Sequence, residues 1–265
     1  MTQKMNQLLI SSAILMMLTS LACGEVQKDV PFVPTPQPVV EEMLRLAEPK
    51  KGEILYDLGC GDGRIVITAA KNYNVKGIGV DIDPQRIKES NENAAKAGVT
   101  DRVKFLEKNL FEMDFSDADV LCMYLLTSVN AKLKPKILAD MKPGARVVSH
   151  AFDLGDWKPD KTVQVKESFN RTVYFWIVPA RVEGTSQGTF KHATLGEWKA
   201  TLNLKQNYQY VTGTARIGDK ELQITDGKLI GDRLTFTADG QTYTCRVPDK
   251  KAKATRAQAA TARSG

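Results

Sequence analysis

Composition and charge do not indicate a nucleic-acid-binding body, despite the excess of basic residues. The chain has 265 residues and a formal net charge of +6. Of its 37 basic residues, five lie in residues 250–265, which contain no acid. The rest of the chain is nearly neutral, with 32 basic and 31 acidic residues. We therefore expect residues 248–265 to be a disordered basic tail. The length suits one sizeable domain and a second small one.

Residues 1–23 combine a single Lys4 with an apolar run over residues 8–21 and end in Ala22-Cys23. This pattern suits a signal peptide better than a membrane span. Three interpretations stay open: a bacterial lipoprotein signal with Cys23 as the lipidated residue, plain secretion, and an uncleaved membrane anchor. We expect a membrane-associated or exported protein, with a cytoplasmic-facing anchor as the alternative.

Four prolines make residues 24–38 an expected extended linker, because proline is unsuited to a helix interior. Apolar residues then recur at helical spacing and predict a helix over residues 38–48.

Residues 53–64 read E-I-L-Y-D-L-G-C-G-D-G-R, which predicts a buried strand, a glycine loop and a helix start. Glycines at alternate positions let the backbone approach a ligand closely. The dinucleotide fingerprint G-x-G-x-x-G would need a glycine where Arg64 stands, which argues against an NAD dehydrogenase. The spacing instead resembles the D-x-G-x-G-x-G loop of class I S-adenosylmethionine (SAM) methyltransferases, with Asp57, Gly59, Gly61 and Gly63 at the cofactor.

Two further segments complete the expected cofactor site. A second buried strand over residues 75–80 ends at Asp81, whose carboxylate can accept hydrogen bonds from both ribose hydroxyls. We include its neighbour Ile82. After a third strand, over residues 103–106, Asn109 stands where such enzymes usually carry an adenine-binding Asp, and its side-chain carbonyl can still accept that bond. We include Leu110 beside it.

The other elements of the main domain follow from apolar periodicity and from turn residues. Helices are expected over residues 85–97 and 132–141, the second despite Pro135, and strands over 118–124 and 145–149. The loop after residue 149 is too broken for a full helix. Strands over residues 162–168 and 172–178 should form a hairpin that closes the sheet edge.

The C-terminal region alternates apolar and polar residues and predicts a small antiparallel β module over residues 188–247. Turns are expected at Gly218-Asp219, Asp226-Gly227 and Asp239-Gly240. We see no catalytic constellation in it and expect substrate docking or packing. The four cysteines and two histidines show no metal-ligand spacing, so we expect no metal and no disulfide framework.

Residues 33–178 resemble bacterial class I methyltransferases related to the protein-lysine methyltransferases that modify mitochondrial inner-membrane proteins. The resemblance rests on P-F-V-P-T-P at 31–36, Y-D-L-G-C-G-D-G-R-I-V-I at 56–67, G-V-D-I-D-P at 79–84 and M-K-P-G-A-R-V-V-S at 141–149. It implies an α/β fold with a seven-stranded Rossmann-like sheet whose last strand is antiparallel, a SAM-dependent methyltransferase domain over residues 39–180, and a protein lysine as methyl acceptor. A membrane-associated protein substrate would match those relatives.

Methyl transfer by in-line displacement needs positioning rather than a metal or a covalent intermediate. The catalytic residues therefore stay unknown from the sequence. Tyr124, Phe152 and Trp157 are candidates to line a desolvating pocket for a neutral lysine amine, and each is equally compatible with ordinary core or loop packing. Two alternatives remain: a small-molecule methyltransferase, and a non-catalytic SAM-binding protein of the envelope. We expect no nucleic-acid partner.

Overall fold

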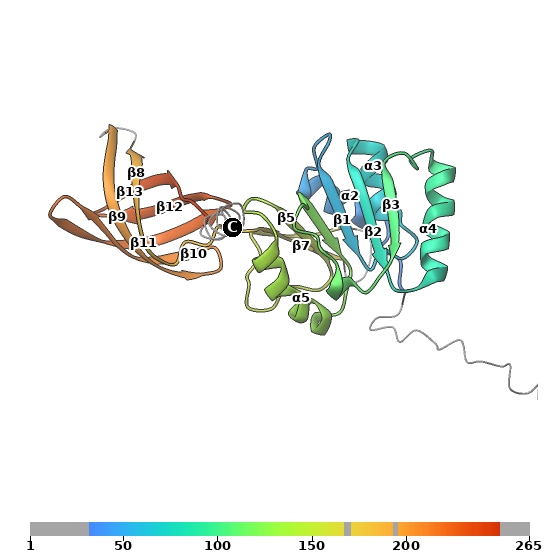
Figure 1. Ribbon diagram of the computed structural model, residues 1–265. Helices are drawn as coiled ribbons and strands as arrows, with labels where there is room; N and C mark the ends of the chain where they lie inside the picture. Colours follow the sequence, from blue (N-terminus) through green and yellow to red (C-terminus); the bar gives the residue numbers. More distant parts are fainter. Residues whose placement is uncertain (1–31, 167–170, 193–195, 250–265) are drawn as a thin grey trace, which may run out of the picture.

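The computed structural model describes residues 32–166, 171–192 and 196–249 as two bodies that lie end to end (Figure 1). The first is a seven-stranded sheet with helices on both faces, and the second is a closed β-barrel. The expected signal or anchor, residues 24–31 of the expected linker and residues 250–265 of the expected tail lie outside the described residues. Asp249, which we expected in the disordered tail, is instead ion-paired with Arg181 at 2.7 Å. Within these residues, no helix is long and apolar enough to cross a membrane.

The sheet has the strand order β3-β2-β1-β4-β5-β7-β6. Strands β1 to β5 pair in parallel, and β7 pairs antiparallel with both β5 and β6. This confirms the predicted sheet and its antiparallel last strand. The strands are β1 (Ile54–Leu58), β2 (Lys76–Asp81), β3 (Val103–Glu107), β4 (Val120–Met123), β5 (Arg146–His150), β6 (Lys161–Gln164) and β7 (Thr172–Ile177).

The strand order reverses between β1 and β4, so the chain crosses to opposite faces of the sheet on either side of this point. In open α/β sheets a ligand binds at such a switch point, beyond the carboxyl ends of the strands. Both the glycine loop and Asp81 lie at those ends. The fold therefore places the predicted cofactor residues at the expected position.

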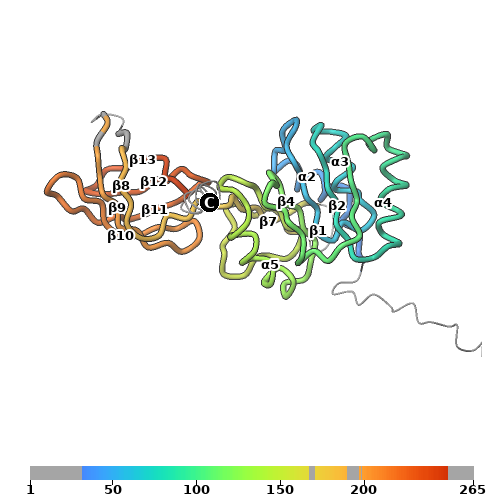
Figure 2. Tube along the Cα trace, in the orientation of Figure 1, coloured from blue at the N-terminus to red at the C-terminus, as the bar shows by residue number. Residues whose placement is uncertain are grey.

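Helices cover the two faces of the sheet unequally. The core on one face includes side chains of α2 (Gln37–Ala47), α3 (Arg64–Tyr73) and α4 (Pro84–Ala97). The core on the other face includes side chains of α5 (Thr127–Asp140). Figure 2 shows α5 on the side of the sheet opposite α2 and α3. A short 3-10 turn, Leu110–Glu112, follows β3.

Helix α5 begins five residues before the expected start at residue 132. The sequence pattern missed its first turn because this segment is barely amphipathic and contains Pro135. Tertiary packing stabilises this first turn, since two of its own residues, Val129 and Asn130, are buried.

The barrel has the strand order β10-β11-β12-β13-β8-β9, and the long strand β9 closes it by pairing with both β8 and β10. The strands are β8 (Gly184–His192), β9 (Gly196–Asn207), β10 (Tyr210–Ile217), β11 (Lys220–Ile230), β12 (Arg233–Ala238) and β13 (Gln241–Arg246). Leu202, Leu229, Leu234 and Phe236 belong to its packed apolar interior. Closure leaves few exposed strand edges, which protects an antiparallel module from edge pairing.

The turns expected at Gly218-Asp219 and Asp239-Gly240 connect strands as predicted. The turn expected at Asp226-Gly227 is wrong, because this pair lies inside β11, where the register to its neighbours shifts. A Cβ on Gly227 would lie 2.2 Å from the Val211 carbonyl oxygen, so the glycine allows two strands to approach closely at a bulge. An Asp-Gly pair is typical of both a turn and a bulge, so the sequence alone could not distinguish the two here.

Candidate active site

The glycine loop between β1 and α3 forms the floor of a pocket at the switch point. Gly59, Gly61 and Gly63 have φ values of 78°, 54° and 79°, a region that side chains other than glycine rarely adopt. A Cβ on Gly61 would lie 2.3 Å from the Phe32 ring, and one on Gly59 would lie 2.8 Å from Leu125. The loop therefore depends on glycine for both its conformation and its close contacts.

Gly63 differs from the other two glycines because it is not among the residues that line the pocket. It is the N-cap residue of α3, its N–H donates to the Cys60 carbonyl oxygen at 2.9 Å, and it packs against Phe105 and Ser90. Its place in the motif reflects the turn into the helix.

Asp57 is a carboxylic acid buried at the base of the pocket, with only 2% of its surface exposed. Burial, together with the nearby carboxylates of Asp81 and Asp62, raises its pKa to about 8. Asp57 is therefore largely protonated at neutral pH in the absence of a bound cation. A cationic ligand in the pocket would favour its ionised form.

Asp81 ends β2 and faces the same pocket. Its carboxylate accepts hydrogen bonds from the backbone N–H of Gly61 at 2.9 Å and of Asp83 at 3.0 Å. Asp81 therefore braces the glycine loop as well as standing at the strand tip where the sequence predicts it. Asp83 caps α4 by accepting the Gln85 N–H, and Pro84 is the first residue of that helix, one residue before the expected start.

The opposite wall comes from residues that follow β2, β3 and β4. Ile82, Asn109, Leu110, Tyr124 and Leu125 all line the pocket. The Asn109 side-chain carbonyl already accepts the Phe111 N–H at 3.0 Å, which closes the turn into Leu110–Glu112. Of the eight predicted cofactor residues, seven therefore converge on one pocket and only Gly63 stands apart.

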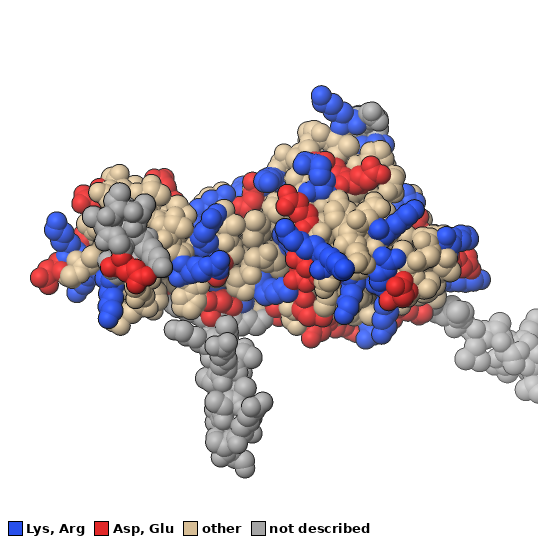
Figure 3. Space-filling view, turned by 90° about the horizontal axis from the view of Figure 1, so that it is seen from above, with Lys and Arg blue, Asp and Glu red and all other residues tan. Residues whose placement is uncertain are grey.

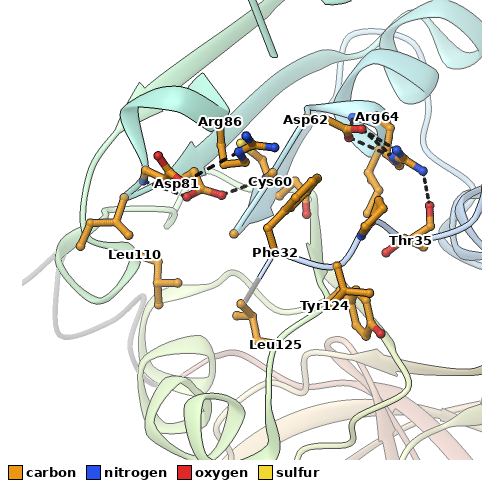
Figure 4. Close-up of a pocket in the computed structure, with 18 of the residues that line it drawn as sticks. Phe32, Thr35, Cys60, Asp62, Arg64, Asp81, Arg86, Leu110, Tyr124 and Leu125 are labelled. Carbon is orange, nitrogen blue, oxygen red and sulfur yellow. Dashed lines mark hydrogen bonds and ion pairs between the residues drawn. The ribbon is translucent and has the colours of Figure 1, made fainter. Parts of the chain in front are cut away.

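A segment that the sequence marked as linker, residues 32–35, forms the outer side of the pocket (Figure 4). The Phe32 ring lies over Gly61, and the Arg86 guanidinium lies 4.6 Å from its centroid. Arg64, paired with Asp62, donates to the Thr35 carbonyl oxygen at 2.9 Å. The P-F-V-P-T-P stretch at residues 31–36 was the only part of the sequence that pointed to this segment, and it did not predict that the segment lies over the glycine loop.

The three aromatic candidates occupy different environments. Tyr124 lines the pocket, and its ring lies 3.9 Å from that of the buried His150. Phe152 stacks behind Tyr124 at 6.1 Å and does not itself line the pocket. Trp157 is fully buried in the core between Trp176 and Tyr208, so it does not reach the pocket.

The thiols of Cys60 and Cys122 are buried and unoxidised, and burial raises the pKa of each well above its usual range. Both thiols are therefore poor nucleophiles at neutral pH. Across the ranges that the structure describes, no group of His, Cys, Asp and Glu side chains could hold a metal ion.

The pocket suits SAM. Its floor is backbone without side chains at Gly59 and Gly61, where a Cβ would clash with Leu125 and Phe32, and Asp57 and Asp81 offer carboxyl groups to a cationic, ribose-containing ligand. Apolar side chains of Ile82, Leu110 and Leu125 supply flat contact surface around these acids. When bound, SAM supplies a methyl group on a sulfonium, a good leaving group for in-line displacement.

Known proteins that are similar to this chain are methyltransferases. The family described as ANTKMT methyltransferase domain matches residues 57–161. A protein-lysine N-methyltransferase of Saccharolobus islandicus is 50% identical over 151 residues, which cover 56% of this chain and 94% of the relative. An adenine nucleotide translocase lysine N-methyltransferase of Mus musculus is 33% identical over 130 residues, 49% of this chain and 56% of the mouse protein. The chain thus spans little more than half the length of the mouse relative.

A solved structure is also similar. The crystal structure of an RNA methyltransferase from Salinibacter ruber, in complex with S-adenosyl-L-homocysteine, is 49% identical with a TM-score of 0.55. The match covers 57% of this chain and 96% of that one.

Fold, pocket and relatives together define a class I SAM-dependent methyltransferase, a transferase whose cofactor is SAM. Within this class, the chain belongs to the same family as the protein-lysine N-methyltransferase of Saccharolobus islandicus.

Proposed function

We propose that this enzyme transfers the methyl group of SAM to the side-chain amine of lysine in a protein. The observation that carries the proposal is the 50% identity to a protein-lysine N-methyltransferase over 94% of that relative's length. The name of the mouse relative also specifies lysine. Substrate assignment rests on these relatives, and the pocket is compatible with it.

The chemistry requires a neutral amine, because the lone pair of nitrogen must form the new N–C bond as the S–C bond breaks. The methylated amine then loses a proton to solvent. An aromatic and apolar wall favours the neutral amine by disfavouring the charged form. Tyr124 and Leu125 line the pocket beside the glycine loop and would provide such a wall.

We propose that Asp81 holds the ribose hydroxyls of SAM and that Asn109 and Leu110 contact its adenine. The position of each residue on the pocket lining supports these roles. The Gly61 N–H, which already donates to Asp81, would then link ribose binding to the conformation of the glycine loop.

RNA is the second candidate acceptor, because the similar Salinibacter structure is that of an RNA methyltransferase. Charge argues against it here. The pocket lining has four acids (Asp57, Asp62, Asp81, Asp83) against three bases (Arg64, Arg86, Lys108). On the face in Figure 3, basic and acidic side chains are interspersed. RNA binding normally requires a basic surface that follows the phosphates.

The acceptor class can be tested by supplying methyl-tritiated SAM to the full-length enzyme with a cell extract. Protein, RNA and small-molecule fractions are then separated and counted. We expect label in protein that survives ribonuclease and is strongly reduced with the Asp81→Ala variant at limiting SAM. Label that ribonuclease releases would favour RNA, label in the small-molecule fraction would favour that alternative, and SAM binding without turnover would indicate a non-catalytic protein.

We also propose that residues 1–23 direct the enzyme to a membrane, so that its substrates include membrane-associated proteins. The apolar run and the Ala22-Cys23 pair support this. Cell fractionation and the mass of the mature N-terminus test it. A soluble product that retains Met1 would refute the tether, and a lipidated Cys23 would support export.

A further inference from the structure

The segment 151–160, between β5 and β6, leaves the sheet in an unusual backbone conformation. Ala151 has a φ of 63°, which is sparsely populated for a residue with a Cβ. Its N–H donates to the Thr172 carbonyl oxygen at 2.7 Å, and the next N–H, of Phe152, donates to the His150 carbonyl oxygen at 2.7 Å. Such a conformation persists only where the surrounding structure holds it.

The first set of contacts comes from the methyltransferase domain itself. Asn130 of α5 is fully buried, and its Nδ2 donates to the carbonyl oxygens of Phe152 at 3.2 Å and Asp153 at 3.1 Å. The Ser149 hydroxyl also donates to the Phe152 carbonyl oxygen, at 2.5 Å. These bonds fix Phe152 where its ring stacks on Tyr124 of the pocket wall.

The second set comes from the barrel. The turn between β9 and β10 brings Tyr208 against the same segment, where its hydroxyl donates to Asp156 Oδ2 at 2.8 Å and its ring stacks on Trp157 at 6.0 Å. The next residue, Gln209, is fully buried, and its Nε2 donates to the Lys158 carbonyl oxygen at 2.8 Å. Three consecutive residues, 156–158, are thus held by one barrel turn.

This barrel turn lies outside the family match, which ends at residue 161. The segment that this turn contacts begins near Phe152, and the Phe152 ring stacks on Tyr124, which lines the pocket. The contacts run without a break from Tyr208 through Trp157 and the segment backbone to the pocket wall. None of them touches the glycine loop or Asp81.

We propose that Tyr208 and Gln209 of the barrel are positioning residues for methyl transfer, which hold segment 151–160 so that Phe152 and Tyr124 present the acceptor wall. This inference rests on the proposed function, transfer to a lysine amine. On this proposal, the barrel helps to position the methyl acceptor and has no part in SAM binding. A displacement of the wall by about 1 Å lowers transfer strongly, since reaction depends on near-attack geometry.

The test compares Tyr208→Ala and Tyr208→Phe with the wild-type full-length enzyme. The acceptor is the unmethylated form of the protein fraction that wild-type enzyme labels. We measure kcat/KM for this acceptor, the SAM dissociation constant and amide hydrogen exchange of residues 151–160. We expect Tyr208→Ala to lower acceptor kcat/KM about tenfold and to speed exchange in this segment, with SAM affinity within about twofold of wild type. Tyr208→Phe keeps the stacking on Trp157 and should recover part of the loss.

Tyr210→Ala is the matched control, because Tyr210 is a tyrosine of the same strand pair that is 46% exposed. It should leave acceptor kinetics and exchange unchanged. Unchanged exchange or unchanged acceptor kcat/KM in Tyr208→Ala would overturn the proposal, as would an equal loss of SAM affinity, which would indicate a general folding defect. If wild-type enzyme labels no protein lysine, the proposed function fails, and hydrogen exchange still decides whether the barrel turn holds the segment.

Discussion

Gly61 shows how a single backbone position controls the pocket. Its φ of 54° disfavours any side chain, and a Cβ there would lie 2.3 Å from the Phe32 ring. We expect Gly61→Ala to weaken SAM binding by at least about tenfold, because the loop and the residue 32–35 segment must both shift. Isothermal titration calorimetry measures this change.

Gly98→Ala provides the control for backbone strain alone. Gly98 also has a positive φ, 67°, but nothing lies within 4 Å of the added Cβ. This variant should lose about 1 kcal/mol of stability and keep its SAM affinity. Equal loss of SAM affinity in both variants would show that the contact with Phe32 is irrelevant.

Asp57 gives the protein a defined pH dependence. Its pKa is about 8 in the folded chain against an ordinary value of 3.8, so between these values the folded state keeps a proton that the unfolded state has lost. The free energy of unfolding should therefore fall as pH rises through this window, by a few kcal/mol at most from this group. Chemical denaturation of wild type and Asp57→Asn at several pH values tests it, since the amide variant should lack this component.

The same linkage acts on the cofactor. SAM carries net positive charge and should bind better when Asp57 is ionised, so its dissociation constant should fall as pH rises from roughly 6 to about 8. The dependence should be absent in Asp57→Asn. A dissociation constant that rises with pH in wild type would contradict a cation-binding role for this acid.

Asp81 is the residue for which sequence and structure make the sharpest joint prediction. Its replacement by Ala removes the proposed ribose contact and the acceptor of the Gly61 N–H. We expect SAM binding to weaken by roughly 1.5–3 kcal/mol, the range for charge-assisted hydrogen bonds. Glu107→Gln is the control, because Glu107 at the end of β3 is the backbone register partner of Asp81 on the neighbouring strand and does not line the pocket. Unchanged affinity in Asp81→Ala would place the ribose elsewhere.

At the scale of elements, the sequence predicted correctly those features that depend only on residues close together in the chain. Strand, glycine loop and helix follow one another within residues 54–73, so spacing alone located Asp57, Gly59 and Gly61. The same reasoning missed the first turn of α5, which depends on burial of Val129 in the core and of Asn130 against segment 151–160. It also predicted a turn at Asp226-Gly227, where neighbouring strands impose a bulge instead.

That bulge leads to a prediction about the barrel. Gly227→Ala would place a Cβ 2.2 Å from the Val211 carbonyl oxygen, so we expect the barrel to lose about 1–3 kcal/mol or more. Gly218→Ala lies in an open turn with nothing within 4 Å and should cost about 1 kcal/mol. Thermal denaturation measures both. Equal losses in the two variants would mean that the close approach at the bulge does not constrain the barrel.

At the scale of the whole molecule, the features that sequence could not supply are contacts between distant segments. Phe32 meets Gly61 and Arg86 across the pocket, and Tyr208 meets Trp157 across the two bodies. No spacing rule connects residues so far apart, and the aromatic pattern alone could not tell the buried Trp157 from the pocket residue Tyr124. The fold class and most of the cofactor site were predictable because they are encoded in short, ordered motifs.

Methyl transfer from SAM to protein lysine is the activity on which the other proposals depend. The most direct measurement uses methyl-deuterated SAM with the full-length enzyme and a protein extract, followed by mass spectrometry of proteolytic peptides. We expect deuterated methyl groups on lysine side chains with wild-type enzyme, and far fewer with Asp81→Ala at a SAM concentration near the wild-type dissociation constant. Deuterated methyl groups that are confined to RNA or to small molecules, or no transfer by an enzyme that binds SAM, would contradict this activity.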